Sequence, residues 1–223
     1  MNHLQSDMMH LLRDIIWIAN SLGRDVMKQK WNDFKSRQVD IQQLDDKVLL
    51  LNLYVTQGIT LILGLVWIWL QGRNPFLLLT TQTSNLSWLW LGAGLAALVI
   101  VVDIAVSRFV PDDMTDDGGV NEKLFRNRPI WHIIAISFIV GVCEEMLFRG
   151  AIQHAFGAYW TSIIFAAIHV RYLRHWLPTG MVFLISFALG TIYEWTGTLW
   201  APILAHFIID LIMGLIIRFR REV

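Results

Sequence analysis

The stretch PIWHIIAISFIVGVCEEMLFRGAIQH, residues 129–154, decides which class of fold the sequence can adopt. It is long and apolar enough to cross a bilayer, since a helical span needs roughly 20 apolar residues. Charged side chains nevertheless interrupt it at Glu144, Glu145 and Arg149. Because ionisable groups inside a spanning helix are costly, they mark this segment as a candidate functional site.

Other stretches share this apolar character and predict a polytopic membrane protein. Of the 223 residues 55% are hydrophobic and only 16% are charged, against about 25% charged in soluble domains. We expect an all-α fold, a polytopic transmembrane helix bundle of about six spanning helices preceded by an N-terminal amphipathic helix. The predicted spans are 48–70, 86–107, 129–154, 159–172, 178–194 and 199–217.

The chain divides by composition into four parts. Residues 1–47 are predicted to form a cytoplasmic amphipathic helical segment, because Leu4, Met8 and Leu11 begin an apolar stripe at helical spacing. Two transmembrane helices and an acidic loop follow in 48–121, then a transmembrane core with polar residues in 122–217, and a basic cytoplasmic tail in 218–223.

Charge and cysteine content limit the membrane topology, the binding partners and the kinds of metal site that the sequence allows. Basic and non-basic loops alternate along the chain, which predicts an integral multi-pass protein of the plasma membrane with both termini in the cytoplasm. The net charge is zero, so nothing indicates a nucleic-acid partner, and the lipid bilayer is the expected one. The single cysteine, Cys143, excludes an internal disulfide and a cysteine-cluster metal site.

Ionisable side chains also occur in the fourth and sixth predicted spans. The fourth holds His169, and the sixth holds His206 and Asp210. Glu145 and Arg149 lie four residues apart, so they share one face of a helix and can pair. His206 and Asp210 have the same spacing. Each pair taken alone is also compatible with a purely structural role in holding the bundle together.

The two adjacent glutamates should meet different surroundings. Glu144 lies about 100° round the helix from Glu145, so one carboxylate can pair with the arginine while the other stays available as a general base. With a turn near Gly157, Glu144 and His169 fall at a similar depth, roughly 18–20 Å from the turn. His206 falls within several Å of that level. Three helices thus bring glutamate and histidine to one layer, which favours a water-filled hydrolytic centre.

Three short motifs in this region resemble those of the CAAX prenyl protease 2 family, also called the CPBP or abortive-infection (Abi) family of intramembrane peptidases. The first is EEMLFR, residues 144–149, two adjacent glutamates and an arginine after three residues. The second is FAAIH, residues 165–169, and the third is HFIID, residues 206–210, preceded by TGTLWAPILA. The resemblance covers about residues 122–217 and departs from the family pattern at Asp210, where asparagine is common.

The resemblance implies an enzyme, a membrane-embedded endopeptidase that hydrolyses a peptide bond of a membrane-associated or prenylated peptide or protein. It also implies roles for the motif residues. Glu144 and His169 would activate the attacking water, and His206 with the residue at 210 would stabilise the oxyanion. The Glu–Arg pair would support the site. Asp210 can orient His206, but it cannot donate to an oxyanion unless it is protonated.

A zinc-dependent reaction fits the same residues. His169, His206 and Glu144 would bind Zn²⁺ as a His₂Glu set, with the other glutamate as the base. The metalloprotease helix that carries two histidines four residues apart around a glutamate is absent from the sequence. Both a metalloprotease and a metal-free, glutamate-type peptidase therefore stay open, and the ligand preferences of zinc favour the metal version.

Two functions of other classes compete with proteolysis. One is a non-catalytic membrane binding or immunity protein of the same family, against which the presence of Glu144, His169 and His206 together argues. The other is a proton-coupled transporter, since carboxylates and histidines within spans also form proton relays. Transporters are often built from repeated halves, and the sequence has no evident internal repeat, which argues against this function.

Overall fold

The computed structural model describes residues 45–80, 86–111, 119–169, 172–173 and 175–220. The chain separates into two compact units, 1–43 and 44–223, and the described residues belong to the second. Most of the amphipathic helix predicted over 1–47, the aspartates of the acidic loop and the last residues of the basic tail lie outside the described residues.

Every regular element in the described part of the chain is a helix, which confirms the predicted all-α class. Asp45 begins the first of them by accepting a hydrogen bond from the backbone N–H of Lys47 at 2.9 Å. In chain order the elements are α2 (Asp46–Leu70), the 3-10 helix η2 (Pro75–Leu79), α3 (Ser87–Phe109), α5 (Val120–Phe125), α6 (Ile130–Glu145), the π-helix η3 (Met146–Ile152), α7 (Gln153–Ile168), α8 (Trp176–Thr196) and α9 (Trp200–Phe219).

α6, η3 and α7 form one helical run that reverses at Gly157. This glycine has φ +76° and ψ 168°, a conformation essentially restricted to glycine, so the predicted turn is confirmed. The rings of Phe148 and Phe165 pack 4.7 Å apart across the hairpin. The arm after the turn, 158–168, is about 16 Å long, too short to cross a hydrocarbon core of about 30 Å.

Five helical runs among the described residues are long and apolar enough to span a membrane. They are α2, α3, the run Ile130–Ile168, α8 and α9. The predicted fourth span, 159–172, corresponds to the short second arm of the hairpin rather than to a separate long helix. The predicted polytopic bundle is therefore confirmed, with its third and fourth spans joined in one run.

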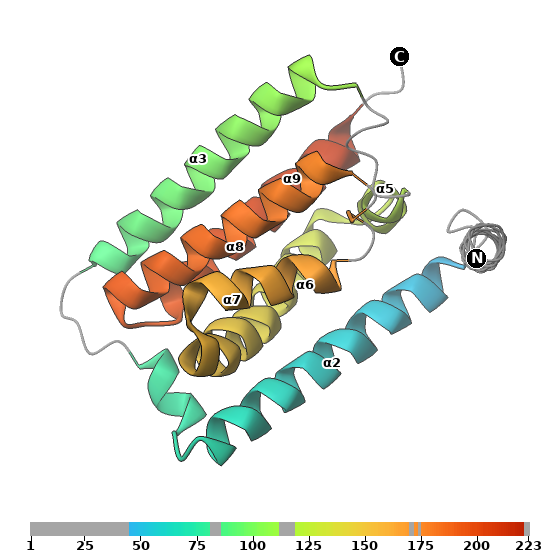
Figure 1. The fold of residues 1–223 in the computed structure, drawn as a ribbon. Coiled ribbons are helices and arrows are strands. Elements are labelled where there is room, and N and C mark those ends of the chain that lie inside the picture. The colour runs from blue at the N-terminus through green and yellow to red at the C-terminus, as the bar shows by residue number, and fades with distance from the viewer. Residues whose placement is uncertain (1–44, 81–85, 112–118, 170–171, 174, 221–223) are drawn as a thin grey trace, which may run out of the picture. The chain divides into compact units, whose positions relative to one another are not determined.

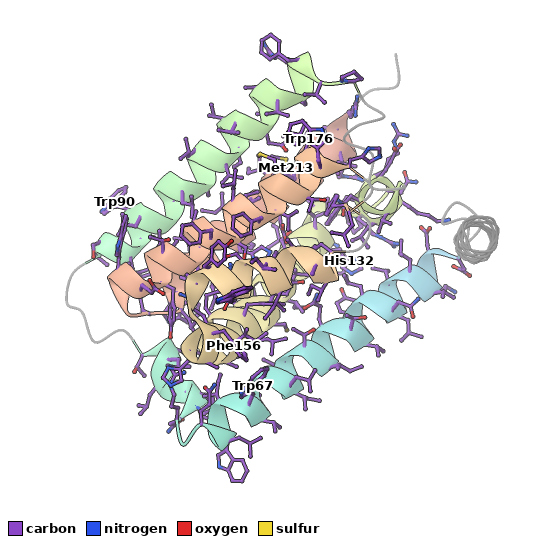
Figure 2. All side chains as sticks on the ribbon, in the orientation of Figure 1. Trp67, Trp90, His132, Phe156, Trp176 and Met213 are labelled. Carbon is purple, nitrogen blue, oxygen red and sulfur yellow. The ribbon has the colours of Figure 1, made fainter. Side chains whose placement is uncertain are left out.

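α9 packs against α3, α6 and α8 and so lies within the bundle. α2 lies along α6 and η3 at one edge, and α3 lies along α9 and α8 at the opposite edge (Figure 1). Large apolar side chains such as Trp69 and Val101 point outward from these edge helices, as suits faces that meet lipid. Trp67 and Trp90 lie toward one end of the bundle and Trp176 toward the other (Figure 2), consistent with two membrane interfaces.

Two glycines let the edge helices approach their neighbours closely. A Cβ at Gly64 of α2 would lie 3.0 Å from the backbone of Leu147 in η3. A Cβ at Gly92 of α3 would lie 2.7 Å from the carbonyl oxygen of Ala201 in α9. Small residues at helix contacts commonly allow such packing in membranes. The contact at Gly64 sets α2 beside the segment that carries the two glutamates.

Candidate active site

The two glutamates lie where α6 gives way to the π-helix η3. Glu144 and Glu145 are the last residues of α6, and Met146–Ile152 continue in the wider π turns. Arg73, just beyond the end of α2, donates from Nη1 to the carbonyl oxygen of Gly150 at 2.7 Å and so ties the π-helix to that end of α2. π turns within helices occur frequently at functional sites, and the hydropathy pattern did not indicate this one.

Glu145 is completely buried and has two charged partners. Its Oε2 lies 3.0 Å from Nε of Arg149, which is also completely buried, so the predicted Glu145–Arg149 pair is confirmed. Its Oε1 lies 2.8 Å from Nδ1 of His206 in α9. Arg149 also donates from Nη2 to the carbonyl and hydroxyl oxygens of Ser186 in α8, at 2.8 and 2.9 Å. The Glu145–Arg149 pair therefore links the α6–η3 run to α8 through Ser186 and to α9 through His206.

His206 lies between two carboxylates. Nδ1 faces Glu145, and Nε2 lies 3.5 Å from Oδ2 of Asp210, so the predicted pairing with Asp210 is confirmed as an ion-pair contact. Ionised carboxylates accept hydrogen bonds and cannot donate them, so only a ring with a hydrogen on each nitrogen can donate to both. The Asp210 side chain is 31% exposed whereas that of Glu145 is fully buried, so the Nε2 side of the ring faces the more open region.

Glu144 faces a different helix from its neighbour. It is half-buried, and its Oε1 accepts a hydrogen bond at 3.1 Å from Nε2 of Gln57 in α2. The prediction that the two adjacent carboxylates meet different surroundings is confirmed. Gln57 did not figure in the predicted site. The signal that points to it is an amide in the apolar span 48–70, which also holds Asn52, since polar groups within spans are functional candidates.

His169 follows α7 as its C-terminal cap and packs beside Phe165. Its Nδ1 lies 2.6 Å from the carbonyl oxygen of Phe165. Because a carbonyl oxygen only accepts, Nδ1 carries the hydrogen, and the neutral ring has its lone pair on Nε2. The Phe165 ring centre is 4.4 Å from that of His169 and 6.4 Å from that of His206, with Cζ of Arg149 5.2 Å above it. All three sequence motifs therefore meet around Phe165.

The donor set does not match a zinc site in this arrangement. Among the residues that the structure describes, no three His, Cys, Asp or Glu side chains gather closely enough to hold a metal ion. Both ring nitrogens of His206 lie near carboxylate oxygens, Nδ1 near Glu145 and Nε2 near Asp210. The hydrogen bonds of Glu144 to Gln57 and of His169 to Phe165 leave Oε2 of Glu144 and Nε2 of His169 as the atoms that would have to bind such an ion. Zinc binding therefore stays a prediction.

A buried Glu–Arg–His cluster lies beside a half-buried glutamate, within helices able to span a membrane, so the chain is a polytopic membrane protein with a buried ionisable centre. The family model described as type II CAAX prenyl endopeptidase Rce1-like matches residues 126–212, which contain all three motifs. The chain is also 49% identical over 131 residues to the uncharacterized protein YpbD of Bacillus subtilis (strain 168), an alignment that covers 59% of this chain and 69% of that protein.

The chain belongs to the Rce1-like family of type II CAAX prenyl endopeptidases, a family of membrane proteases. This confirms the family that the three motifs indicated. No solved structure matches the chain.

Proposed function

We propose that this protein is an intramembrane endopeptidase that hydrolyses a peptide bond of a membrane-associated substrate, with prenylated polypeptides as the class that the family suggests. The observation that carries the proposal is the difference between two adjacent carboxylates. Glu145 is occupied by Arg149 and His206, whereas the half-buried Glu144 meets a neutral amide from α2. Environments that separate two neighbouring carboxylates in this way commonly give them different chemical roles.

Glu144 and His169 activate the attacking water in this proposal. The Glu144 carboxylate takes one proton from the water as its oxygen adds to the carbonyl carbon of the scissile peptide. Nε2 of His169 accepts a hydrogen bond from the other water hydrogen and so orients the attacking lone pair. The hydrogen bond from Nδ1 to the carbonyl of Phe165 supports this assignment, because it leaves Nε2 as the acceptor.

His206 stabilises the negative charge that develops on the carbonyl oxygen. Glu145 holds the ring at Nδ1, and the imidazolium donates from Nε2 to the oxyanion. Asp210 lies 3.5 Å from Nε2 and keeps a hydrogen on that nitrogen before substrate arrives. We therefore assign Asp210 to orienting His206 rather than to binding the oxyanion. Arg149 compensates the buried charge of Glu145 and holds it in place.

Collapse of the tetrahedral intermediate completes the reaction. The C–N bond breaks, and the proton held by Glu144 passes to the leaving nitrogen. One water is consumed, the peptide becomes a carboxylic acid and an amine, which ionise to a carboxylate and an ammonium group, and Glu144 returns to its ionised form. Every group in these steps belongs to the chain itself.

Basic residues at one end of the bundle support a cytoplasmic position for that end. Arg128 lies 3.4 Å from Asp46 at the start of α2, and Arg218 near the end of α9 donates to the carbonyl oxygen of Arg126 at 3.2 Å. The start of α2 and the end of α9 therefore lie at the same end. Because basic residues concentrate on the cytoplasmic side, we propose a plasma-membrane protein whose two termini are both cytoplasmic.

Cleavage of membrane-tethered fluorogenic peptides in nanodiscs, prenylated and plain, tests the proposed function. Wild type would be run beside Glu144→Ala and beside Asp103→Ala, which removes an exposed carboxylate from α3 as a matched control. We expect wild type and Asp103→Ala to cleave alike and Glu144→Ala to be slower by about 10²–10⁴-fold, the usual contribution of a general base. Wild-type rates in a folded Glu144→Ala protein would show that the base is assigned wrongly.

A further inference from the structure

Gln57 is a buried amide on an otherwise apolar face of α2. It is 5% exposed, and the residues of α2 that are buried with it are Gly64 and Ile68. The close approach of Gly64 to the backbone of Leu147 brings α2 to the end of α6. At that point Nε2 of Gln57 donates to Oε1 of Glu144, the carboxylate proposed as the base, at 3.1 Å.

The orientation of this amide follows from its partner. An ionised carboxylate only accepts hydrogen bonds, so the nitrogen of the Gln57 amide must face Glu144 and the oxygen must face away. That oxygen, Oε1, is buried and has no hydrogen-bond partner among the described residues. An unpaired buried acceptor costs about 1–3 kcal/mol and is rare in native proteins, so the group calls for an explanation.

A peptide substrate brings donors of the kind that this oxygen lacks. Backbone N–H groups that enter an apolar membrane interior lose their hydrogen bonds to water, and each needs an acceptor there. Oε1 belongs to the same rigid amide group as the nitrogen that holds Glu144. An N–H bound at Oε1, about 3 Å away, would therefore lie beside the base.

On the basis of the proposed hydrolytic function, we propose that Gln57 is a positioning residue that acts at both ends of its amide. Nε2 fixes the carboxylate of Glu144, and Oε1 accepts a hydrogen bond from a backbone N–H of the substrate near the scissile bond. Gln57 thereby couples the position of the base to the position of the peptide. The ligand recognised at this point is the peptide backbone, independent of side chain or prenyl group.

The experiment combines enzyme variants with altered substrates. Gln57→Leu removes both the amide nitrogen and the amide oxygen. As the matched control, Asn52→Leu replaces an amide by leucine at an exposed position of the same helix. Each protein, in nanodiscs, is given a series of cleaved peptides in which an ester oxygen replaces one backbone N–H at a time, with the scissile amide left intact. Thermal unfolding verifies folding, and Gln57→Met provides a second variant should the leucine prevent folding.

With unaltered peptide we expect kcat/KM to fall about 10–100-fold in Gln57→Leu and to stay within about twofold in Asn52→Leu. In the ester series, one position should lower kcat/KM of wild type about tenfold. The same ester should leave kcat/KM of Gln57→Leu nearly unchanged, because this variant already lacks the acceptor of that N–H. Unchanged kcat/KM in a folded Gln57→Leu, or esters that slow both proteins equally, would overturn the proposal. Absence of cleavage by wild type would instead overturn the proposed function, on which this role depends.

Discussion

Replacing Arg149 by leucine should destabilise the protein severely. The Arg149 side chain is completely buried, and its partner Glu145 is equally buried. Arg149 also makes two hydrogen bonds to Ser186 and lies over the ring of Phe165. The substitution would remove these contacts and leave the Glu145 carboxylate without its arginine. Loss of one partner from a buried ion pair typically costs about 3–5 kcal/mol, a large fraction of the stability of a domain.

The chain contains a matched control for this prediction. Glu122 and Arg126 form an ion pair at the same four-residue spacing, but their side chains are 52% and 30% exposed. Exposed pairs of this kind contribute about 0.3–0.5 kcal/mol, so Arg126→Leu should change stability little. The double variant Glu145→Leu/Arg149→Leu should be less destabilised than the sum of its single changes, because no unpaired buried charge remains.

Reversible unfolding in mixed detergent micelles, followed by tryptophan fluorescence, measures all of these variants. We expect a loss of about 3–5 kcal/mol for Arg149→Leu and less than about 1 kcal/mol for Arg126→Leu. Equal effects of the two substitutions would refute the reasoning. So would strict additivity in the double variant, since it would mean that the buried charges do not interact.

The same geometry also predicts the effects of substitutions at Gly157 and Asp210 and of metal removal. Gly157→Ala should destabilise the protein by about 1–3 kcal/mol, because Gly157 has a φ of +76°. Gly180→Ala, where a Cβ would meet open space in α8, should be neutral or stabilising. Thermal unfolding compares the two variants. Asp210→Asn should keep kcat within about threefold, because the amide oxygen still accepts from His206, and Asp210→Leu should lower kcat at least about tenfold in the peptide-cleavage assay. Extensive metal removal with 1,10-phenanthroline should leave cleavage unchanged, and activity that is lost and then restored by Zn²⁺ would establish the zinc version instead.

Hydropathy was sufficient to locate most of the helices. The predicted spans 86–107 and 199–217 correspond to Ser87–Phe109 and Trp200–Phe219, because the length of an apolar run decides whether it can cross a bilayer. The span 159–172 was extended too far toward its C-terminus. Its helix ends at Ile168, and the ring of His169 turns back to the carbonyl of Phe165. The position where this helix ends depends on side-chain contacts, which hydropathy averaged along the sequence does not reveal.

The local pairs of the site were predictable, whereas its contacts between helices were not. Four-residue spacing alone predicted the Glu145–Arg149 and His206–Asp210 pairs. The contact between Glu145 and His206, and the one between Glu144 and Gln57, depend on how each helix is rotated about its axis. Close approaches such as that of α2 to η3 set this rotation, and a single sequence contains no measure of it.

The adjacency of the two glutamates accounts for much of what the site can do. Successive residues on a helix point about 100° apart, so neighbouring side chains at the end of α6 reach different helices. Glu145 reaches α9 and contacts Nδ1 of His206 at 2.8 Å, the contact that in the proposed mechanism favours a doubly protonated ring able to donate to an oxyanion. Glu144 reaches α2 and meets Gln57, a neutral partner that leaves its carboxylate able to accept a proton. A single carboxylate could not both fix His206 and act as the general base. An ion pair strong enough to fix His206 would make that carboxylate a poor acceptor of a proton from water.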